Sequence, residues 1–307
     1  MSHFALGVPA RYRMAELPEY QSNPLIEALP PIFSEIEAKD LLKYAPVVDE
    51  HVRTLPMHIR MHAVINAADF FLPQPLHLDL EQRFSRLIRG GYRNRNPVLP
   101  GYWPATNHQI AEMRIRHRSP QPTGPQVNLP HVSTSRGMSI VGVSGIGKTT
   151  ALKRILSLYP QVIIHSSYHR KPFTHCQIVW LRLEMPRNGR LSDLVKQFFQ
   201  SLDQTLGTTY YHDFIGRSRR SIEEFVPDMA NLALKHSIGV LVIDEIQNLV
   251  NSRGTTAAEM LSFLVELDNT IGIPIVLVGT PKARPILQSE FRSARRASGQ
   301  GIWNGNG

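Results

Sequence analysis

The pattern of hydrophobic and polar residues changes near residue 136. Beyond it, short runs of Val, Ile and Leu alternate with longer stretches in which apolar residues recur every three or four positions. The short runs are typical of buried strands, and the longer stretches of amphipathic helices. Because the two kinds alternate, we predict an α/β fold with a parallel sheet covered by helices on both faces. The predicted strands are 137–143, 177–185, 239–246 and 273–280, and the predicted helices are 148–159, 191–206, 221–237 and 256–272.

The residues before 136 differ because prolines interrupt them repeatedly. Apolar residues at helical spacing predict helices at 34–45 and 78–92, and Gly90 and Gly91 are expected to end the second. The segment SPQPTGPQVNLP is rich in proline and glycine, which defeat both helix and sheet. We therefore divide the chain into a proline-rich, mostly helical N-terminal region (1–118), a linker (119–135), a core (136–301) and a tail (302–307).

The segment GVSGIGKTT follows the first predicted strand and opens the first predicted helix of the core. It fills the spacing G-x-x-x-x-G-K-[ST], which binds nucleotide phosphates. The glycines let backbone N–H groups face the phosphates, and the helix directs its positive end toward them. Lys148 is expected to reach the terminal phosphates, and the Thr149 hydroxyl to ligate Mg²⁺. The predicted phosphate-binding residues are Gly142, Val143, Ser144, Gly145, Ile146, Gly147, Lys148, Thr149 and Thr150.

Two acidic residues end the apolar run of the strand predicted at 239–246. Asp244 is expected to meet the Mg²⁺ at the carboxyl edge of the sheet, and Glu245 to polarise the attacking water. Adjacent acids at this position favour ATP hydrolysis over phosphate transfer to a metabolite. Thr280, at the end of a further strand, has two interpretations: it positions the water against the γ-phosphate, or it caps the next helix.

The formal net charge of +9 suggests an acidic partner, and nucleic acid is the first candidate, although a merely soluble basic protein fits as well. Two basic loops are candidates for contact with a DNA backbone. Each is equally compatible with solvated surface. One loop contains His169, Arg170 and Lys171, and the other contains Arg187 and Arg190.

His165, His169, His175 and Cys176 lie close together in the sequence, as zinc ligands often do. Only His165 and His169 have a spacing that suits one helix face, and a proline interrupts the segment. A basic loop that leaves the sheet is therefore favoured over a metal site.

The chain has a single cysteine, so no disulfide can form within it, which fits a reducing cytosol. The N-terminus has no signal-peptide pattern, and no apolar run approaches the length of a transmembrane helix. We expect a cytoplasmic protein that does not enter a membrane.

Three segments carry a resemblance to a known family: GVSGIGKTTALKRILSLYPQV, GVLVIDEIQNL and VLVGTPKARPILQSEFRSARRASGQG. Together they resemble the AAA+ ATPases that regulate transposition in bacterial elements, the TnsC and TniB group, and the similarity is strongest to TnsC. The N-terminal segments NPLIEALPP, RTLPMHIRMHAV and LIRGGYRNRNP resemble the same subgroup. Many ATPases share the ATP motifs, whereas the N-terminal segments and GTPKAR…RSARR are much more specific to this group. The resemblance covers nearly the whole chain.

The resemblance implies an AAA+ switch and adaptor that binds ATP and Mg²⁺ and controls when transposition proceeds. Such proteins form homo-oligomers on DNA through sequence-independent backbone contacts. They link a target-selector protein of the TniQ/TnsD type to the transposase subunits, and the N-terminal region is expected to take part in these partner contacts.

The resemblance also implies roles for single residues. Lys148 and Thr149 take the Walker A roles, and Asp244 and Glu245 take the Walker B roles. Thr280 takes the sensor position.

Three arginines follow, Arg292, Arg295 and Arg296. From the residues alone, a solvated basic face is favoured. The resemblance makes Arg295 or Arg296 the arginine finger that reaches a neighbouring subunit's γ-phosphate.

Family members continue with another strand and a helical lid over the nucleotide. This sequence ends in GQGIWNGNG, where that strand should begin, so we expect the lid to be absent. Two other functions fit the same motifs: a non-hydrolysing scaffold that binds DNA or protein, and a AAA+ ATPase of the helicase-loader or replication-initiator type. ATPase turnover, measured with and without DNA, distinguishes the scaffold from the proposed switch. A neighbouring transposase gene distinguishes the transposition switch from a helicase loader or replication initiator.

Overall fold

The computed structural model describes residues 7–46, 49–118, 137–216, 223–251, 260, 263–264, 272–285 and 302–304. The linker predicted at 119–135, most of the helix predicted at 256–272 and the arginines Arg292, Arg295 and Arg296 lie outside these residues. None of the helices described is long and apolar enough to cross a membrane.

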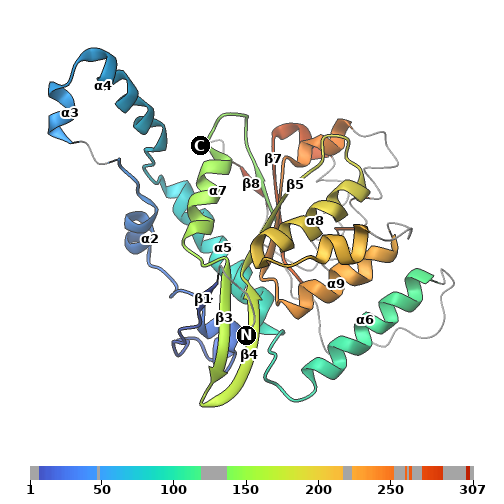
Figure 1. The fold of residues 1–307 in the computed structure, drawn as a ribbon. Helices are drawn as coiled ribbons and strands as arrows, with labels where there is room; N and C mark the ends of the chain where they lie inside the picture. Colours follow the sequence, from blue (N-terminus) through green and yellow to red (C-terminus); the bar gives the residue numbers. More distant parts are fainter. Residues whose placement is uncertain are drawn as a thin grey trace.

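A five-stranded sheet forms the centre of the molecule, and every pairing within it is parallel (Figure 1). This confirms the predicted fold class. In order across the sheet, its strands are β5 Trp180–Glu184, β6 Val240–Asp244, β7 Ile275–Gly279, β2 Met138–Val141 and β8 Ile302–Asn304.

The helices lie around this sheet and in an N-terminal extension. They are α1 Pro24–Glu27, α2 Glu35–Leu42, α3 Glu50–Thr54, α4 Met57–Ala63, α5 Pro75–Arg93, α6 Tyr102–Arg118, α7 Lys148–Ser157, α8 Leu191–Leu206 and α9 Val226–Lys235. Short turns of helix complete them: η1 Pro18–Tyr20, η2 Val64–Asp69, η3 Tyr211–Gly216, η4 Glu223–Phe225, η5 Ile246–Asn251 and η6 Pro281–Ala283.

Both faces of the sheet are buried, because successive strand residues point to opposite sides. Leu241 and Ile243 of β6 pack in one core with α8 and α9. Val240 and Val242 of the same strand pack in a second core with α5 and α7. A strand buried on both faces is a continuous apolar run, which is why the sequence pattern located β6 correctly.

Helix α5 differs from the prediction, because it continues through Gly90 and Gly91 to Arg93. A Cβ atom at Gly91 would lie 2.6 Å from the Cγ atom of Pro274, just before β7. Gly91 therefore serves close packing between α5 and the sheet rather than helix termination. The amide of Asn23 then donates a hydrogen bond to the carbonyl of Tyr92, near the end of α5 (2.9 Å).

The segment predicted as one strand at 177–185 belongs to two sheets. Strand β4 Lys171–Ile178 pairs antiparallel with β3 Val162–Tyr168, and β1 Val8–Pro9 adds to β3 in parallel. Strand β5 begins at Trp180 and pairs with β6. An apolar run does not reveal that its pairing partner changes, so the prediction merged the two strands and missed the hairpin of β3 and β4.

The edge of the central sheet holds a second difference. Residues 302–307 were assigned to a tail outside the core, but β8 pairs with β2 along Ser139–Val141. Ile302–Asn304 is thus a strand of the core sheet. Gly305 and Gly307 suggested that no strand forms here, yet both lie beyond its last residue.

An arm with α3 and α4 extends away from the body of the molecule (Figure 1). The guanidinium of Arg154 on α7 lies 4.3 Å from the ring centre of Tyr44 and donates to the carbonyl of Asp69 (3.2 Å), which anchors the base of the arm. The arm exposes large apolar side chains, namely Met57, Ile59, Met61, Val64, Ile65, Phe70 and Leu72.

Candidate nucleotide-binding site

The loop between β2 and α7 has the backbone that its glycines predict. Gly145 and Gly147 have φ angles of 84° and 87°, in the left-handed region that favours glycine. Gly147 is the N-cap of α7, so the loop leads directly to the positive end of a ten-residue helix. This is the arrangement that binds phosphate groups at a helix N-terminus.

Lys148 folds back over this loop. Its Nζ atom donates hydrogen bonds to the carbonyl oxygens of Gly142 and Val143, each 2.8 Å long. A bound phosphate offers the same ammonium a charged acceptor, which forms a stronger hydrogen bond than a neutral carbonyl does. The lysine is therefore placed to exchange these carbonyls for phosphate oxygens.

Asp244 ends β6 with its side chain buried and both carboxylate oxygens in use. The backbone N–H of Glu245 donates to Oδ1 (2.9 Å). Oδ2 accepts from the Thr149 hydroxyl (3.3 Å) and from Nη2 of Arg182 (2.8 Å). A hydroxyl and a carboxylate are the oxygen donors that Mg²⁺ prefers, so Thr149 and Asp244 fit the predicted metal-binding pair.

Glu245 follows in a strained conformation, with a φ angle of 59°. Its carboxylate accepts a hydrogen bond from the side-chain amide of Gln247. The oxygen of the same amide accepts from the backbone N–H of Thr280 (3.0 Å). Gln247 thus connects Glu245 to Thr280 across two neighbouring strands.

The Thr280 hydroxyl is buried and has no hydrogen-bond partner within the described part of the chain. It forms no side-chain cap on η6. An unpaired buried hydroxyl is costly and is common at functional sites. The Thr280 hydroxyl therefore does not cap η6, and the sensor role of Thr280 stays a prediction.

Gly279 allows these groups to converge. A Cβ atom there would lie 2.5 Å from Cγ2 of Ile246 and 2.8 Å from Oε1 of Gln247. Its carbonyl accepts a hydrogen bond from the N–H of Gly142 (3.2 Å), at the start of the phosphate loop. The three predicted motifs therefore meet at the carboxyl edge of the sheet.

Sequence reasoning missed two members of this site, Arg182 and Gln247. Arg182 is a charged residue between Leu181 and Leu183 in the middle of a strand, and that pattern could have singled it out. Gln247 carried no comparable signal, because its role depends on where β7 lies.

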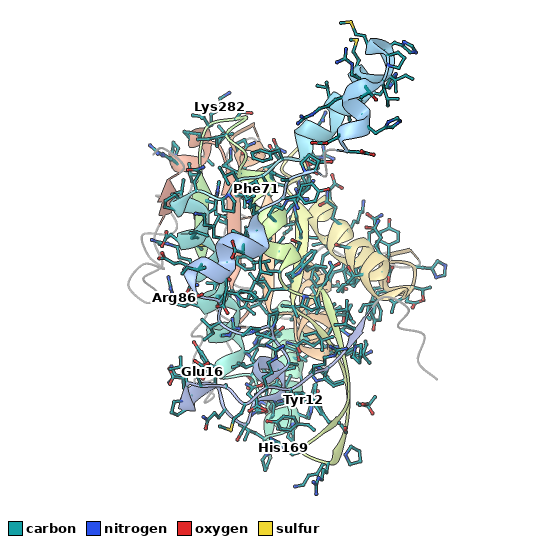
Figure 2. The ribbon with its side chains drawn as sticks, turned by 90° about the vertical axis from the view of Figure 1, so that its left-hand side faces the viewer. Tyr12, Glu16, Phe71, Arg86, His169 and Lys282 are labelled. Carbon is teal, nitrogen blue, oxygen red and sulfur yellow. The ribbon has the colours of Figure 1, made fainter. Side chains whose placement is uncertain are left out.

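The two predicted basic loops lie at opposite ends of the molecule. Arg187 and Arg190 follow β5 at the carboxyl edge, where Lys282 also lies, whereas His169 is at the other end (Figure 2). His169 and Arg170 form the turn between β3 and β4, with φ angles of 48° and 64°. The predicted basic loop is therefore a hairpin tip.

The histidines near this hairpin are structural. His165 forms hydrogen bonds with the Tyr12 hydroxyl (2.7 Å) and with Oε1 of Gln177 (2.9 Å). His175 forms a hydrogen bond with the Ser237 hydroxyl (2.8 Å). Burial lowers the pKa of His165 to about 4 and that of His175 to about 3. Within the described residues, no group of three or more His, Cys, Asp or Glu side chains is placed to hold a metal ion.

The fold and this site together define a P-loop nucleotide-binding protein. Residues 131–287 match the model of the AAA domain family, which is half of the chain, and the chain belongs to that family. Membership implies nucleoside triphosphate binding, typically with Mg²⁺.

Comparison with curated proteins gave no match. Among solved structures, the crystal structure of Cdc6p from Pyrobaculum aerophilum matches with 14% sequence identity and a TM-score of 0.35. The match covers 69% of this chain and 48% of the other, so this chain spans about half the length of that relative.

Proposed function

We propose that this protein is an ATP-dependent regulator of DNA transposition, an AAA+ switch and adaptor that binds ATP and DNA and assembles into oligomers. One observation supports the switch: Lys148, Thr149, Asp244, Glu245 and Thr280 meet at one edge of the sheet, joined through neighbouring groups. The transposition role rests on the sequence resemblance. The three N-terminal segments that carry this resemblance lie outside the ATP-binding motifs, and only those motifs are shared with replication initiators.

The proposed chemistry assigns each residue a separate task. The loop N–H groups and Lys148 bind the phosphates, and Thr149 and Asp244 hold Mg²⁺, which neutralises phosphate charge. Glu245 orients the attacking water and receives its proton. Gln247 orients the Glu245 carboxylate through its amide nitrogen, and its amide oxygen accepts from the backbone N–H of Thr280.

Nucleotide binding is tested by titrating a fluorescent ATP analogue. Lys148→Ala should reduce affinity by more than tenfold, because a phosphate loses its main charged partner. Glu245→Gln should bind as the wild type does and hydrolyse ATP at least a hundredfold more slowly. Equal affinity of the wild type and Lys148→Ala would refute the assignment.

DNA contact is proposed for the loop with Arg187 and Arg190, which lies at the same edge of the sheet as the nucleotide site, and for the hairpin tip at His169, Arg170 and Lys171. Backbone contacts release counterions, so affinity should fall linearly with log salt concentration.

The double variant Arg187→Gln, Arg190→Gln should flatten this salt dependence. A matched control, Lys39→Gln with Lys43→Gln, removes the same charge from an exposed part of the N-terminal region and should leave it unchanged. If duplex DNA fails to bind at low salt with a non-hydrolysable ATP analogue present, the DNA-binding proposal is wrong.

Oligomerisation and partner contacts complete the proposal. The exposed apolar side chains of the arm suit a protein partner, either the target selector of the TniQ/TnsD type or the transposase. Arg295 or Arg296 would complete the nucleotide site of the next subunit, so ATP should promote assembly on DNA.

Sizing with ATP and DNA tests this, and the double variant Arg295→Ala, Arg296→Ala should stay monomeric. Transposition in a reconstituted reaction separates this role from that of a replication initiator. If the frequency of transposition is the same with and without this protein, the proposed regulatory role is wrong.

A further inference from the structure

Arg182 occupies an unusual position for an arginine. It lies in β5, where its backbone is paired in register with Val242 of β6, two residues before Asp244. Because neighbouring strands of a parallel sheet are aligned, residues two positions apart along β6 share one face. The Arg182 side chain therefore reaches along that face to Asp244, where Nη2 donates to Oδ2 at 2.8 Å.

The same carboxylate oxygen is the point of contact with Thr149. Oδ2 accepts from the Thr149 hydroxyl, while Oδ1 is used by the N–H of Glu245. Thr149 and Asp244 are the pair that fits Mg²⁺. The guanidinium of Arg182 is thus a monovalent cation on the oxygen that a divalent cation would use.

The ion pair is asymmetric in its surroundings. The Asp244 side chain is only 3% exposed, so its charge needs a cation nearby, whereas the Arg182 side chain is 30% exposed. In the described part of the chain, Nε of Arg182 is buried and has no hydrogen-bond partner. Arg182 thus uses only part of its hydrogen-bonding capacity here, although its ion pair with Asp244 is short, at 2.8 Å.

We infer that Arg182 is a positioning residue that competes with Mg²⁺ for Asp244, so that metal loading at the nucleotide site requires Arg182 to release Oδ2. Removing Arg182 has two opposite effects. The carboxylate loses its compensating charge, which destabilises the protein without metal. Mg²⁺ no longer displaces a competitor and no longer meets a like charge, so its apparent affinity rises.

The inference rests on nucleotide and Mg²⁺ binding at the phosphate loop and is independent of any role in transposition. It is tested with mant-ADP, a fluorescent nucleotide, without DNA and without a transposase. Affinity is measured in excess EDTA and in saturating MgCl₂. The ratio of the two dissociation constants gives the coupling between metal and nucleotide, and it cancels damage that weakens both equally.

Arg182→Gln should increase this coupling ratio about tenfold over the wild type, which corresponds to ~1.4 kcal/mol. Arg114→Gln is the matched control, because it breaks another arginine–aspartate pair between separate elements, Arg114 with Asp228 (3.2 Å). That variant should leave the ratio unchanged. Arg182→Lys keeps the charge without the planar guanidinium and should give an intermediate ratio, which keeps the test available if Arg182→Gln does not fold.

Three results would overturn the inference. The first is an unchanged or smaller coupling ratio in Arg182→Gln, which is what a purely structural role predicts. The second is an equal rise in Arg114→Gln. The third is a wild-type protein that binds mant-ADP equally with and without Mg²⁺, because Asp244 then binds no metal that Arg182 could oppose.

Discussion

Acid should destabilise this protein through three buried histidines, His165, His175 and His236. Each is at most 8% exposed. Burial lowers their pKa values from the usual 6.5 to about 4, 3 and 4, respectively. The unfolded chain binds protons at these residues below pH 6.5, whereas the folded chain resists protonation until the pH is near 4. These histidines therefore leave the free energy of unfolding nearly unchanged above pH 6.5 and lower it from pH 6.5 to about pH 4, and to about pH 3 for His175.

The magnitude follows from proton linkage. At pH 5 an unfolded histidine is almost fully protonated and each folded one almost fully neutral, which costs about 2 kcal/mol for each residue. The three together give about 6 kcal/mol as an upper figure, since part of the His175 shift comes from repulsion by the other two. That is comparable to the whole stability of many domains.

Burial is the main reason why these histidines are neutral, because the hydrogen bond to Gln177 by itself raises the pKa of His165. Oε1 of Gln177 can only accept, so His165 carries its proton on Nε2, and Nδ1 accepts from Tyr12. The orientation of Gln177 is fixed because its amide nitrogen donates to the carbonyl of Leu25 (2.9 Å). Lys235 further lowers the pKa of His236 by charge repulsion.

Urea unfolding between pH 7.5 and pH 5 measures the effect. We expect the free energy of unfolding to fall steeply below pH 6.5. His175→Asn should remove about a third of the fall, and His58→Asn, an exposed residue of α4, should not change it. A free energy of unfolding that stays constant over this range would refute the reasoning, because the histidines would then titrate alike in both states.

Three further predictions concern single positions. Gly91→Ala should destabilise the protein by about 1–3 kcal/mol, because the new methyl group overlaps Pro274. Gly90→Ala places its methyl group where no atom lies within 4 Å, so it should be neutral or stabilising by about 0.5–1 kcal/mol. Chemical denaturation of both variants measures the difference. Leu152→Ala, in the fully buried face of α7, should cost about 2–5 kcal/mol by the same measurement. Gln247→Leu should lower ATP turnover tenfold or more with little change in nucleotide affinity, since it frees the Glu245 carboxylate; equal loss of affinity and turnover would contradict a role in orienting that base.

Much of the nucleotide site could be predicted from the sequence because its signals are local. The spacing of Gly142, Gly147, Lys148 and Thr149 specifies a loop and a helix start within a few residues, and the structure has both. Asp244 could be placed because it ends a strand buried on both faces, which is a continuous apolar run. Helix α8 was predicted from residue 191 to residue 206, and it has these bounds because its apolar stripe is regular. The limits of the N-terminal region and the linker, the DNA contacts and the arginine finger stay predictions.

Only the tertiary structure decided which distant residues meet. Arg182 reaches Asp244 because β5 and β6 are neighbours in register, and Gln247 connects Glu245 to Thr280 because β7 lies beside β6. The hairpin of β3 and β4, the pairing of β8 with β2 and the packing of Gly91 against Pro274 depend on the same kind of contact. Periodicity shows which face of an element is buried, but it carries no information about which element covers that face. Strand order and close packing between remote segments are therefore fixed by the whole fold.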